Sequence, residues 1–315
     1  MKISVLDWST VTTGDISSEA IEALGEVNFF PSTAPEDTVK NIGDAEIVLC
    51  NKVLITREVM DTCPNIRYIG LFATGFNNVD IEAAREKGIV VCNAGQYSTN
   101  AVAQQVFAYI LEIFGRINEY DRAVKNGEWV RSPLFSYFPI PTAELAGKTL
   151  SIVGYGSIGR KVAEIGNAFG MNIVVNTRTA PKDCPYEVTD LETAVKKADV
   201  LTFHCPLTDK TENTIDRSLL SMMKPAAVLI NTARGGLVNE DELADALNSG
   251  TIAYACLDVL RREPMSPDTP LRNAKNCIIT PHIAWSPLET RERLVRIVSD
   301  CVRSWQNGEI KNKVN

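Results

Sequence analysis

The sequence predicts an α/β protein with two doubly wound parallel sheets, and three observations support this fold class. The chain has 315 residues, which is more than a single core usually fills. Short apolar runs alternate with helix-like stretches, and repeated βαβ units of this kind give parallel sheets covered on both faces. The alternation is interrupted once, between residues 98 and 147, and this interruption separates two series of units.

The first series occupies residues 1–97. Its strand-like runs are "ISVL", "EVNFF", "AEIVLC", "IRYIGLF" and "GIVVCN". Helices are expected near 17–24, 35–41, 56–62 and 80–87, and their predicted N-caps include Ser17, Thr56 and Asp80.

The interruption begins with a single long helix, predicted from Ser98 to about Asn126. Its apolar face comprises Val102, Val106, Tyr109, Ile113, Ile117, Tyr120 and Val124. Such a helix would span about 40 Å, enough to bridge two domains, and would end at "KNG". Residues 129–147, "WVRSPLFSYFPIPTAELAG", have many aromatics and prolines but no period. They are either an irregular loop over the body or an arm that packs against a second subunit.

The second series starts at Thr149. Its strand-like runs are "LSIVGYG", "NIVVNT", "VLTFHCPL", "AVLINTARGG", "IAYACLDV" and "NCIITPHIAW". Helices are expected near 158–169, 190–198, 216–222 and 239–248, and the predicted caps are Asp190, Asp216 and Asn239. A last amphipathic helix runs from Pro287 to about Gln306, with Leu294, Ile297, Val298 and Cys301 on its apolar face. We expect it to pack on the first domain and make that domain discontinuous.

Composition excludes several classes of partner. The net charge of -7 argues against nucleic acid or an acidic membrane surface, which require a basic protein surface. Eight cysteines form no C-x-x-C pair and mostly lie in apolar runs such as "IVLC", which predicts reduced, buried thiols and a cytoplasmic protein. The first apolar run ends at Asp7, too early for a signal peptide, and no run has the length of a membrane span. No metal site is predicted.

The stretch "SIVGYGSIGR" predicts a dinucleotide site. Gly154 permits the tight turn, Gly156 lets the backbone approach a pyrophosphate, and Gly159 lets helix and strand pack closely. The amides of Ser157 and Ile158 would face the phosphates at the start of the helix. We therefore predict a Rossmann-type dinucleotide domain over 99–286. Residues 1–98 and 287–315 would form a flavodoxin-like substrate domain.

The choice of nucleotide depends on the end of the next strand. An acidic residue usually binds the adenosine ribose of NAD there, but this chain has Thr177 and Arg178. Arg178 can pair with a 2′-phosphate, which favours NADP. The alternative is that Arg178 is a solvated residue beside the adenine and that the cofactor is NAD.

A histidine acid or base must be His204 or His282, because the chain contains no other histidine. His204 follows a strand and either lines the cofactor site or fills space there, while His282 follows another strand in "ITPHIAW". Arg234 follows a strand predicted to be buried, where a guanidinium is costly without an anion to bind. Glu263 and Asp258 compete as the partner of the histidine, and the residues alone do not separate them.

The motifs "VGYGSIGRKVA", "HCPLT", "LINTARGGLVNEDEL", "TPHIAW" and "FATGFNNVD" resemble, in order, the D-isomer-specific 2-hydroxyacid dehydrogenase family. The resemblance implies that Arg234, Glu263 and His282 are catalytic and that the amides of Thr74 and Gly75 bind the substrate carboxylate. It also implies homodimers formed through the 98–147 helix and arm. The positions implied to lie on the cofactor side are Pro206, Thr232, Ala233 and Asp258.

Within that family, "HIAW" and "FPIPTAELAGKTL" are similar to the glycerate dehydrogenase (hydroxypyruvate reductase) branch. This similarity implies hydride transfer between NAD(P)H and a small 2-keto acid such as hydroxypyruvate. Trp285 either narrows the substrate pocket or packs at the domain hinge. Thr177 and Arg178 depart from the Asp that many members carry. The alternative function is a dinucleotide-sensing corepressor of the same fold.

Overall fold

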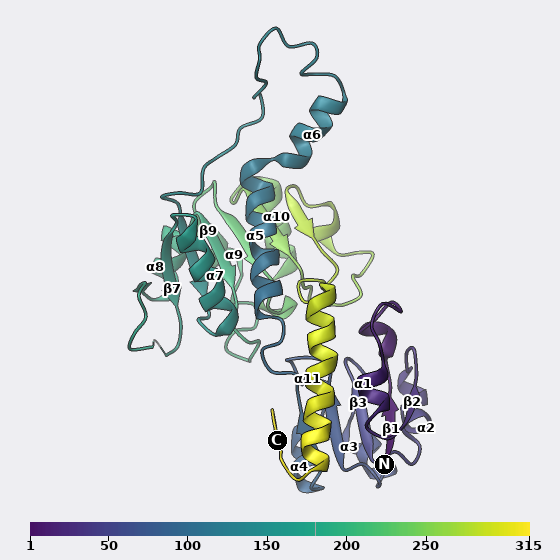
Figure 1. Ribbon diagram of the computed structural model, residues 1–315. Coiled ribbons are helices and arrows are strands. Elements are labelled where there is room, and N and C mark those ends of the chain that lie inside the picture. The colour runs from purple at the N-terminus through teal and green to yellow at the C-terminus, as the bar shows by residue number, and fades with distance from the viewer. Residues whose placement is uncertain (180) are drawn as a thin grey trace. The chain divides into compact units, whose positions relative to one another are not determined.

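The structure is a computed structural model that describes residues 1–179 and 181–315. The chain forms two compact units: a terminal unit, Met1–Ser98 with Trp285–Asn315, and a central unit, Thr99–Ala284. Each unit contains one parallel sheet with helices between its strands (Figure 1). The predicted fold class is therefore confirmed.

The sheet of the terminal unit has five strands in the order β2-β1-β3-β4-β5, and all its pairs are parallel. The strands are β1 (Lys2–Val5), β2 (Glu26–Phe29), β3 (Ile47–Cys50), β4 (Tyr68–Leu71) and β5 (Val90–Cys92). The helices are η1 (Trp8–Thr10), α1 (Glu19–Glu22), η2 (Pro35–Asp37), α2 (Thr38–Ile42), α3 (Arg57–Thr62), α4 (Ile81–Glu86) and α11 (Leu288–Gln306). The strand order reverses at β1, so the sheet is doubly wound in the flavodoxin-like order.

Two of the three caps predicted for this unit are confirmed. The side chains of Thr56 and Asp80 accept backbone N–H groups at the starts of α3 and α4. The third cap is wrong, because the N-cap of α1 is Ser18 and its side chain makes no capping hydrogen bond. The hydroxyl of Ser17 instead accepts the amide of Glu19 at 3.2 Å, in a local turn just before the helix.

The sheet of the central unit has seven parallel strands in the order β12-β11-β10-β9-β6-β7-β8. The strands are β6 (Thr149–Val153), β7 (Asn172–Asn176), β8 (Glu187–Val188), β9 (Val200–Phe203), β10 (Val228–Asn231), β11 (Tyr254–Leu257) and β12 (Cys277–Ile279). The helices after residue 126 in this unit are α7 (Ser157–Ala168), α8 (Leu191–Lys197), α9 (Arg217–Met222), η3 (Gly235–Leu237), α10 (Glu240–Ser249) and η4 (Pro270–Asn273). Asp190, Asp216 and Asn239 cap α8, α9 and α10 as predicted. Strand β8 was not predicted, because its two exposed residues carry no apolar pattern.

The predicted single helix from 98 to 126 is wrong. Two helices occupy this segment, α5 (Thr99–Gly115) and α6 (Ile117–Lys125), separated by Arg116 in a left-handed conformation with φ of 54°. That conformation ends the hydrogen-bond ladder of α5, and Figure 1 shows α6 turning away from it. The side chain of Arg116 lies 4.7 Å from the ring centre of Tyr254. The apolar face is buried through Ile113, whereas Ile117 is 66% exposed.

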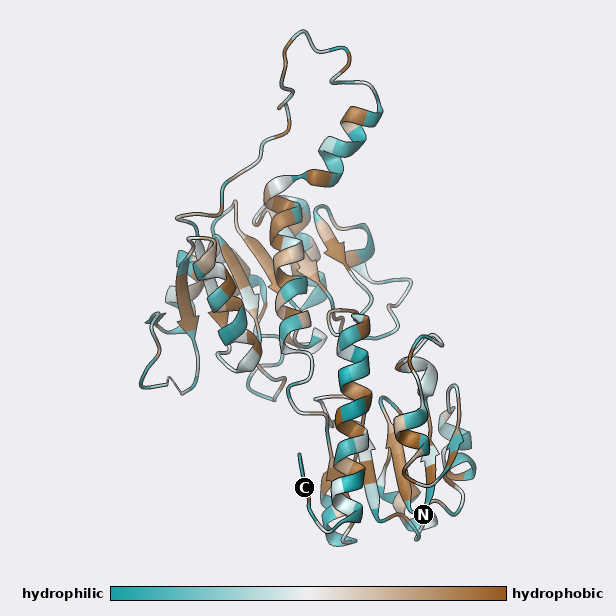
Figure 2. Ribbon diagram, in the orientation of Figure 1, coloured by the Kyte–Doolittle hydropathy of each residue, from teal (hydrophilic) through white to brown (hydrophobic). Residues whose placement is uncertain are grey.

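Residues 129–147 form no helix or strand, which both interpretations of this segment allow. Their aromatic side chains do not fold back into the core, since Phe135 is 93% exposed and Phe138 is 75% exposed. Figure 2 shows apolar residues along the strands of both sheets and further apolar residues in α6 and this segment. Among the residues that the structure describes, no helix is both long and apolar enough to span a bilayer.

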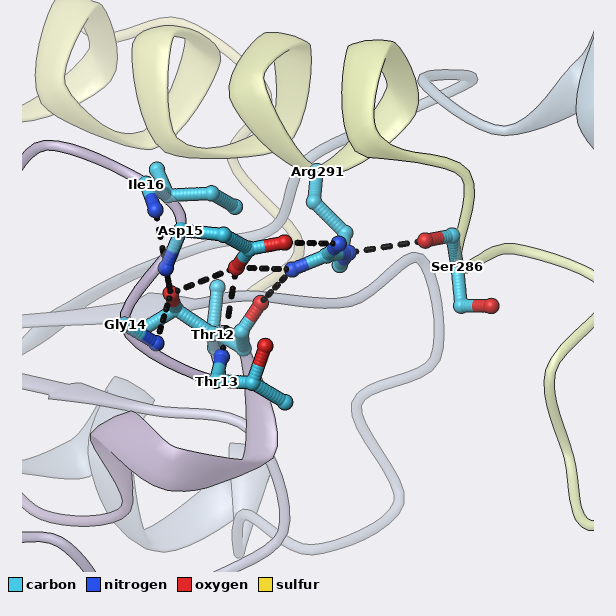
Figure 3. Close-up of polar contacts among 8 residues, drawn as sticks. Thr12, Thr13, Gly14, Asp15, Ile16, Ser286 and Arg291 are labelled. Atoms are coloured by element: carbon cyan, nitrogen blue, oxygen red, sulfur yellow. Dashed lines mark hydrogen bonds and ion pairs between the residues drawn. The ribbon is translucent and has the colours of Figure 1, made fainter.

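Helix α11 packs on the core of the terminal unit, where its residues Leu294, Val298 and Cys301 are buried. An ion pair also binds its first turn to another segment of the same unit. The guanidinium of Arg291 binds both carboxylate oxygens of Asp15, at 2.8 and 2.7 Å, and its Nε donates to the carbonyl of Ser286 at 2.7 Å (Figure 3). These bonds hold the pKa of the Asp15 carboxyl well below its usual range.

We expect Asp15→Asn to lower the melting temperature at pH 7. A depressed pKa in the folded state stabilises the protein fully above the unfolded pKa of about 4; this contribution declines below that pH and is lost as the pH falls through the folded pKa. The difference in melting temperature between wild type and variant should therefore shrink from pH 7 to pH 3. The control is Asp300→Asn, in an exposed pair with Arg303 on the same helix. A difference as large at pH 3 as at pH 7 would contradict the role of the charge.

Candidate functional site

The glycine loop joins β6 to α7 with the geometry that its sequence predicts. Gly154 has a φ of +98°, and a side chain there would lie 2.6 Å from the carbonyl of His204. A Cβ on Gly159 would lie 2.1 Å from the carbonyl oxygen of Gly154. Gly156 is the N-cap of α7, and a Cβ on it would meet no atom within 4 Å. The space beside Gly156 is therefore open, and the amides of Ser157 and Ile158 lie in the first turn of α7, at the positive end of the helix.

The predicted cofactor-side residues lie at the carboxyl ends of five adjacent strands, β7, β6, β9, β10 and β11. In that order they are Thr177 and Arg178, the glycine loop, His204 and Pro206, Thr232 and Ala233, and Asp258. The strand order reverses between β6 and β9, which is where ligands bind in doubly wound sheets. The buried hydroxyl of Thr232 has no hydrogen-bond partner among the described residues. The unpaired Thr232 hydroxyl and the glycine loop lie at the same edge of the sheet, and together they fit a bound dinucleotide.

The end of β7 carries no carboxylate. The strand ends at Asn176, whose side chain donates to the carbonyl of Thr189 at 2.9 Å. Thr177 is half-buried and Arg178 is exposed. A ribose bound here would meet a hydroxyl and a guanidinium instead of an acid.

His204 is held as a neutral ring. Its Nε2 lies 3.0 Å from the hydroxyl of Thr202, and its backbone N–H donates to the carbonyl of Val153 at 2.7 Å. Burial lowers the pKa of His204 to about 3, so at neutral pH the ring is neutral and is not an imidazolium acid. This leaves His282 as the histidine able to act as an acid.

His282 is paired with Glu263. The Nδ1 atom of His282 lies 2.6 Å from Oε2 of Glu263, and Oε1 of the same carboxylate accepts the amide of Leu260 at 2.9 Å. The carboxylate is thus oriented by the backbone on one side and by the ring on the other. His282 has a φ of 56°, a conformation that residues other than glycine rarely adopt and that concentrates at functional sites. With Nδ1 on the carboxylate, Nε2 is the ring nitrogen that can face a substrate oxygen.

Asp258 holds the backbone of the loop that presents His282. Its buried carboxylate accepts the hydroxyl of Thr280 at 2.5 Å and the amides of Ile283 and Ala284 at 2.9 Å each. The carbonyl of Asp258 also accepts the amide of His282 at 2.8 Å. The ambiguity left by the sequence is therefore resolved: Glu263 binds the ring and Asp258 binds the loop. Thr280 bonds to Asp258, and the hydroxyl of Tyr109 bonds to Thr280. No motif in the sequence predicts these two contacts.

Arg234 differs from its prediction in one respect. Its side chain is exposed, so the expectation of a costly buried guanidinium is wrong. Its Nη1 donates to the carbonyl of Ala233 at 2.6 Å. The buried side chain of Asn231 donates to the carbonyl of Arg234 and accepts the amide of Ala233, which fixes the turn. A Cβ on Gly235 would lie 1.8 Å from the carbonyl carbon of Leu260, so the Arg234 turn packs directly on the segment that leads to Glu263.

Thr74, Gly75 and Trp285 belong to the terminal unit. The Thr74 hydroxyl donates to the carbonyl of Gly95 at 2.5 Å, and the side chain of Asn93 donates to the carbonyl of Thr74 at 2.7 Å, which fixes the loop after β4. Trp285 packs on the core of this unit and lies 6.4 Å, between ring centres, from Tyr97.

Comparisons with known proteins agree on one family. Residues 107–284 match the family described as "D-isomer specific 2-hydroxyacid dehydrogenase, NAD binding domain". The chain is 40% identical to hydroxypyruvate reductase of Blautia hydrogenotrophica, over all of both chains. It is 38% identical to glycerate dehydrogenase of Methylorubrum extorquens, covering 95% of this chain and 97% of the relative. The structure of an NADPH-dependent glyoxylate/hydroxypyruvate reductase from Sinorhizobium meliloti, in complex with NADP and malonate, superposes with a TM-score of 0.84. That protein is 28% identical, and the match covers 99% of this chain and 96% of the other.

Proposed function

The chain belongs to the D-isomer specific 2-hydroxyacid dehydrogenase family, and on this premise we propose that it interconverts hydroxypyruvate and D-glycerate with a nicotinamide dinucleotide. One observation carries the proposal most directly. The 2.6 Å pair of His282 and Glu263 lies in the unit whose sheet edge carries the glycine loop. The central unit would bind the dinucleotide, and the terminal unit would bind the substrate.

The bound cofactor would supply a hydride to the keto carbon. His282 would donate a proton from Nε2 to the keto oxygen, while Glu263 at Nδ1 stabilises the imidazolium before the transfer. Arg234, exposed and fixed at its backbone, would pair with the substrate carboxylate and polarise the neighbouring carbonyl. In the terminal unit, the amides of Thr74 and Gly75 are the groups proposed to bind a substrate carboxylate, and Trp285 is the residue proposed to limit substrate size.

The corepressor alternative is not supported. The full-length relatives described above are named for catalysis, and a protein that only senses dinucleotide has no need of the paired His282 and Glu263. A panel of 2-keto acids assayed with both cofactors separates the two functions. Binding of dinucleotide without reduction of any keto acid would favour the corepressor.

We expect His282→Ala to lower kcat/KM for hydroxypyruvate by about 10²- to 10⁴-fold, the usual contribution of one general acid. Glu263→Gln should lower it less, because the ring stays in place but its charge loses a partner. The dissociation constant for NADPH, measured by fluorescence titration, should change little in both variants. Near-normal turnover by His282→Ala would refute the assignment.

We propose NADP as the cofactor and keep NAD as the alternative. The family description names NAD, whereas the S. meliloti relative holds NADP. The choice for this chain therefore depends on Thr177 and Arg178, which replace a carboxylate that would repel a 2′-phosphate.

Arg178→Ala should raise the KM for NADPH by about 10- to 100-fold, because a charge-assisted hydrogen bond to the phosphate is lost. The KM for NADH should stay within a factor of about three, since NADH has no phosphate at that position. Lys182→Ala, at an exposed cation in the loop that follows, serves as the control. A strong preference of the wild type for NADH would end this proposal.

We also propose a homodimer formed through α5, α6 and residues 129–147. A monomer rarely exposes so many large apolar side chains on one segment. The residues concerned are Leu111, Ile117, Val124, Trp129, Val130, Leu134, Phe135 and Phe138. A pocket on α5 and α7, lined in part by Phe107, Leu111 and Ile165, adds apolar surface to the same unit.

All eight cysteines are free, which suits a reducing compartment such as the cytoplasm.

The double variant Phe135→Asp with Phe138→Asp should be monomeric at micromolar concentration, because two charges would be buried without partners in the interface. Sedimentation equilibrium measures the mass of the particle. Ile310→Asp, which charges an exposed apolar residue of the terminal unit, should leave the dimer intact. A monomeric wild type would contradict the dimer.

A further inference from the structure

Among the described residues, two carboxylates are buried: Asp258, 2% exposed in the central unit, and Asp7, 3% exposed in the terminal unit. Both accept backbone N–H groups of a loop at the carboxyl edge of a parallel sheet. Asp258 in this way fixes the loop that carries His282. Asp7 makes the same kind of contacts in the other unit, but it has no role in the proposed reaction steps.

The carboxylate of Asp7 binds three successive amides. Its Oδ1 accepts the amide of Asn51 at 2.8 Å, while Oδ2 accepts those of Lys52 at 2.7 Å and Val53 at 3.3 Å. A carboxylate only accepts hydrogen bonds, so it matches a concave run of N–H donors. Thr10 closes the arrangement, because its hydroxyl donates to the carbonyl of Asp7 at 2.7 Å and accepts the side-chain amide of Asn51 at 3.1 Å.

The loop that Asp7 holds is joined in turn to the loop after β4. The side chain of Asn78 donates to the carbonyl of Val53 at 2.9 Å, and the carbonyl of Asn78 accepts the amide of Ile55 at 2.8 Å. The amide of Asp80 donates to the carbonyl of Ile55 at 3.0 Å. Residues 51–55 are therefore bonded between Asp7 on one side and the 72–80 loop on the other.

The 72–80 loop carries Thr74 and Gly75. Strands β3 and β4 are neighbours in the sheet, so the loops that follow them lie at the same edge. A backbone amide binds an anion well only when its direction is fixed, because the bond weakens steeply as it bends. The network from Asp7 through Val53 and Asn78 supplies such a constraint, in addition to the bond by which Asn93 holds the carbonyl of Thr74.

We propose that Asp7 is a positioning residue for substrate binding: through residues 51–53 and Asn78 it sets the direction of the amides of Thr74 and Gly75 that receive the substrate carboxylate. The inference rests on the proposed function. It differs from a purely structural role in what it predicts. A residue that only stabilises the fold changes the fraction of folded enzyme, whereas a positioning residue changes the KM of the folded enzyme.

The test is Asp7→Asn in the full-length chain. The side chain keeps its size, but its NH₂ group faces backbone donors, so the 51–53 loop must shift. We expect the KM for hydroxypyruvate to rise at least about tenfold, since small misplacements of substrate-binding groups have effects of this order. The inhibition constant of oxamate, a carboxylate that cannot be reduced, should rise in parallel. The value of kcat should fall by a smaller factor, and the dissociation constant for NADPH should not change.

Two further variants make the result decisive. Asp15→Asn is the matched control, because it removes a carboxylate of the same N-terminal segment that binds α11 and not the 51–53 loop; it should lower stability and leave the KM unchanged. Asn78→Ala cuts the same network from its other end and should raise the KM as Asp7→Asn does. If Asp7→Asn does not fold, the KM of Asn78→Ala decides.

An unchanged KM in folded Asp7→Asn, with only a lower melting temperature, would overturn the proposal. An unchanged KM in Asn78→Ala would do the same where Asp7→Asn cannot be purified. Failure of the proposed function itself is recognised separately, because the wild type would then reduce no 2-keto acid.

Discussion

The carboxylate of Asp258 is the contact on which the candidate site depends. It is buried, and two backbone amides and one hydroxyl occupy its oxygens. A buried charge without such partners would cost several kcal/mol, so the loop cannot move away from it cheaply. Because the loop is held at residues 280, 283 and 284, His282 is kept in a left-handed conformation and its ring meets Glu263. The chemistry proposed for the ring thus depends on an acid that does not touch it.

The sequence predicts this protein well wherever burial dictates the residue type. Strands covered on both faces, such as β3 and β9, are continuous apolar runs, whereas the two exposed residues of β8 have no pattern to recognise. The helix break at Arg116 could not be predicted, because the apolar period continues through it and the left-handed conformation depends on local contacts such as that with Tyr254. Glu263 and Asp258 follow one strand within six residues, and only the geometry separates ring partner from loop partner.

The two units organise their strand ends in related ways. In the central unit, Gly156 leaves open space beside the first turn of α7, which suits the phosphates of a dinucleotide. The position where an acid would bind the ribose holds Thr177, so the negative charge that excludes a 2′-phosphate is missing. In the terminal unit, the loops after β3, β4 and β5 are tied to one another by asparagine side chains. Backbone N–H groups without a protein partner can bind an anion, and hydrogen bonds between neighbouring loops keep the direction of such N–H groups fixed.

The net charge of -7 makes the choice of donors important. Long-range attraction does not favour an anionic substrate at this surface, so its binding must come from short, directed hydrogen bonds. Backbone N–H groups are suited to this, because they carry no side-chain entropy and the fold sets their direction. Asp7 and Asp258 show that the chain already binds carboxylates in this way inside its own core. The proposed capture of a keto acid by the amides of Thr74 and Gly75 would repeat the same interaction with a carboxylate from solution.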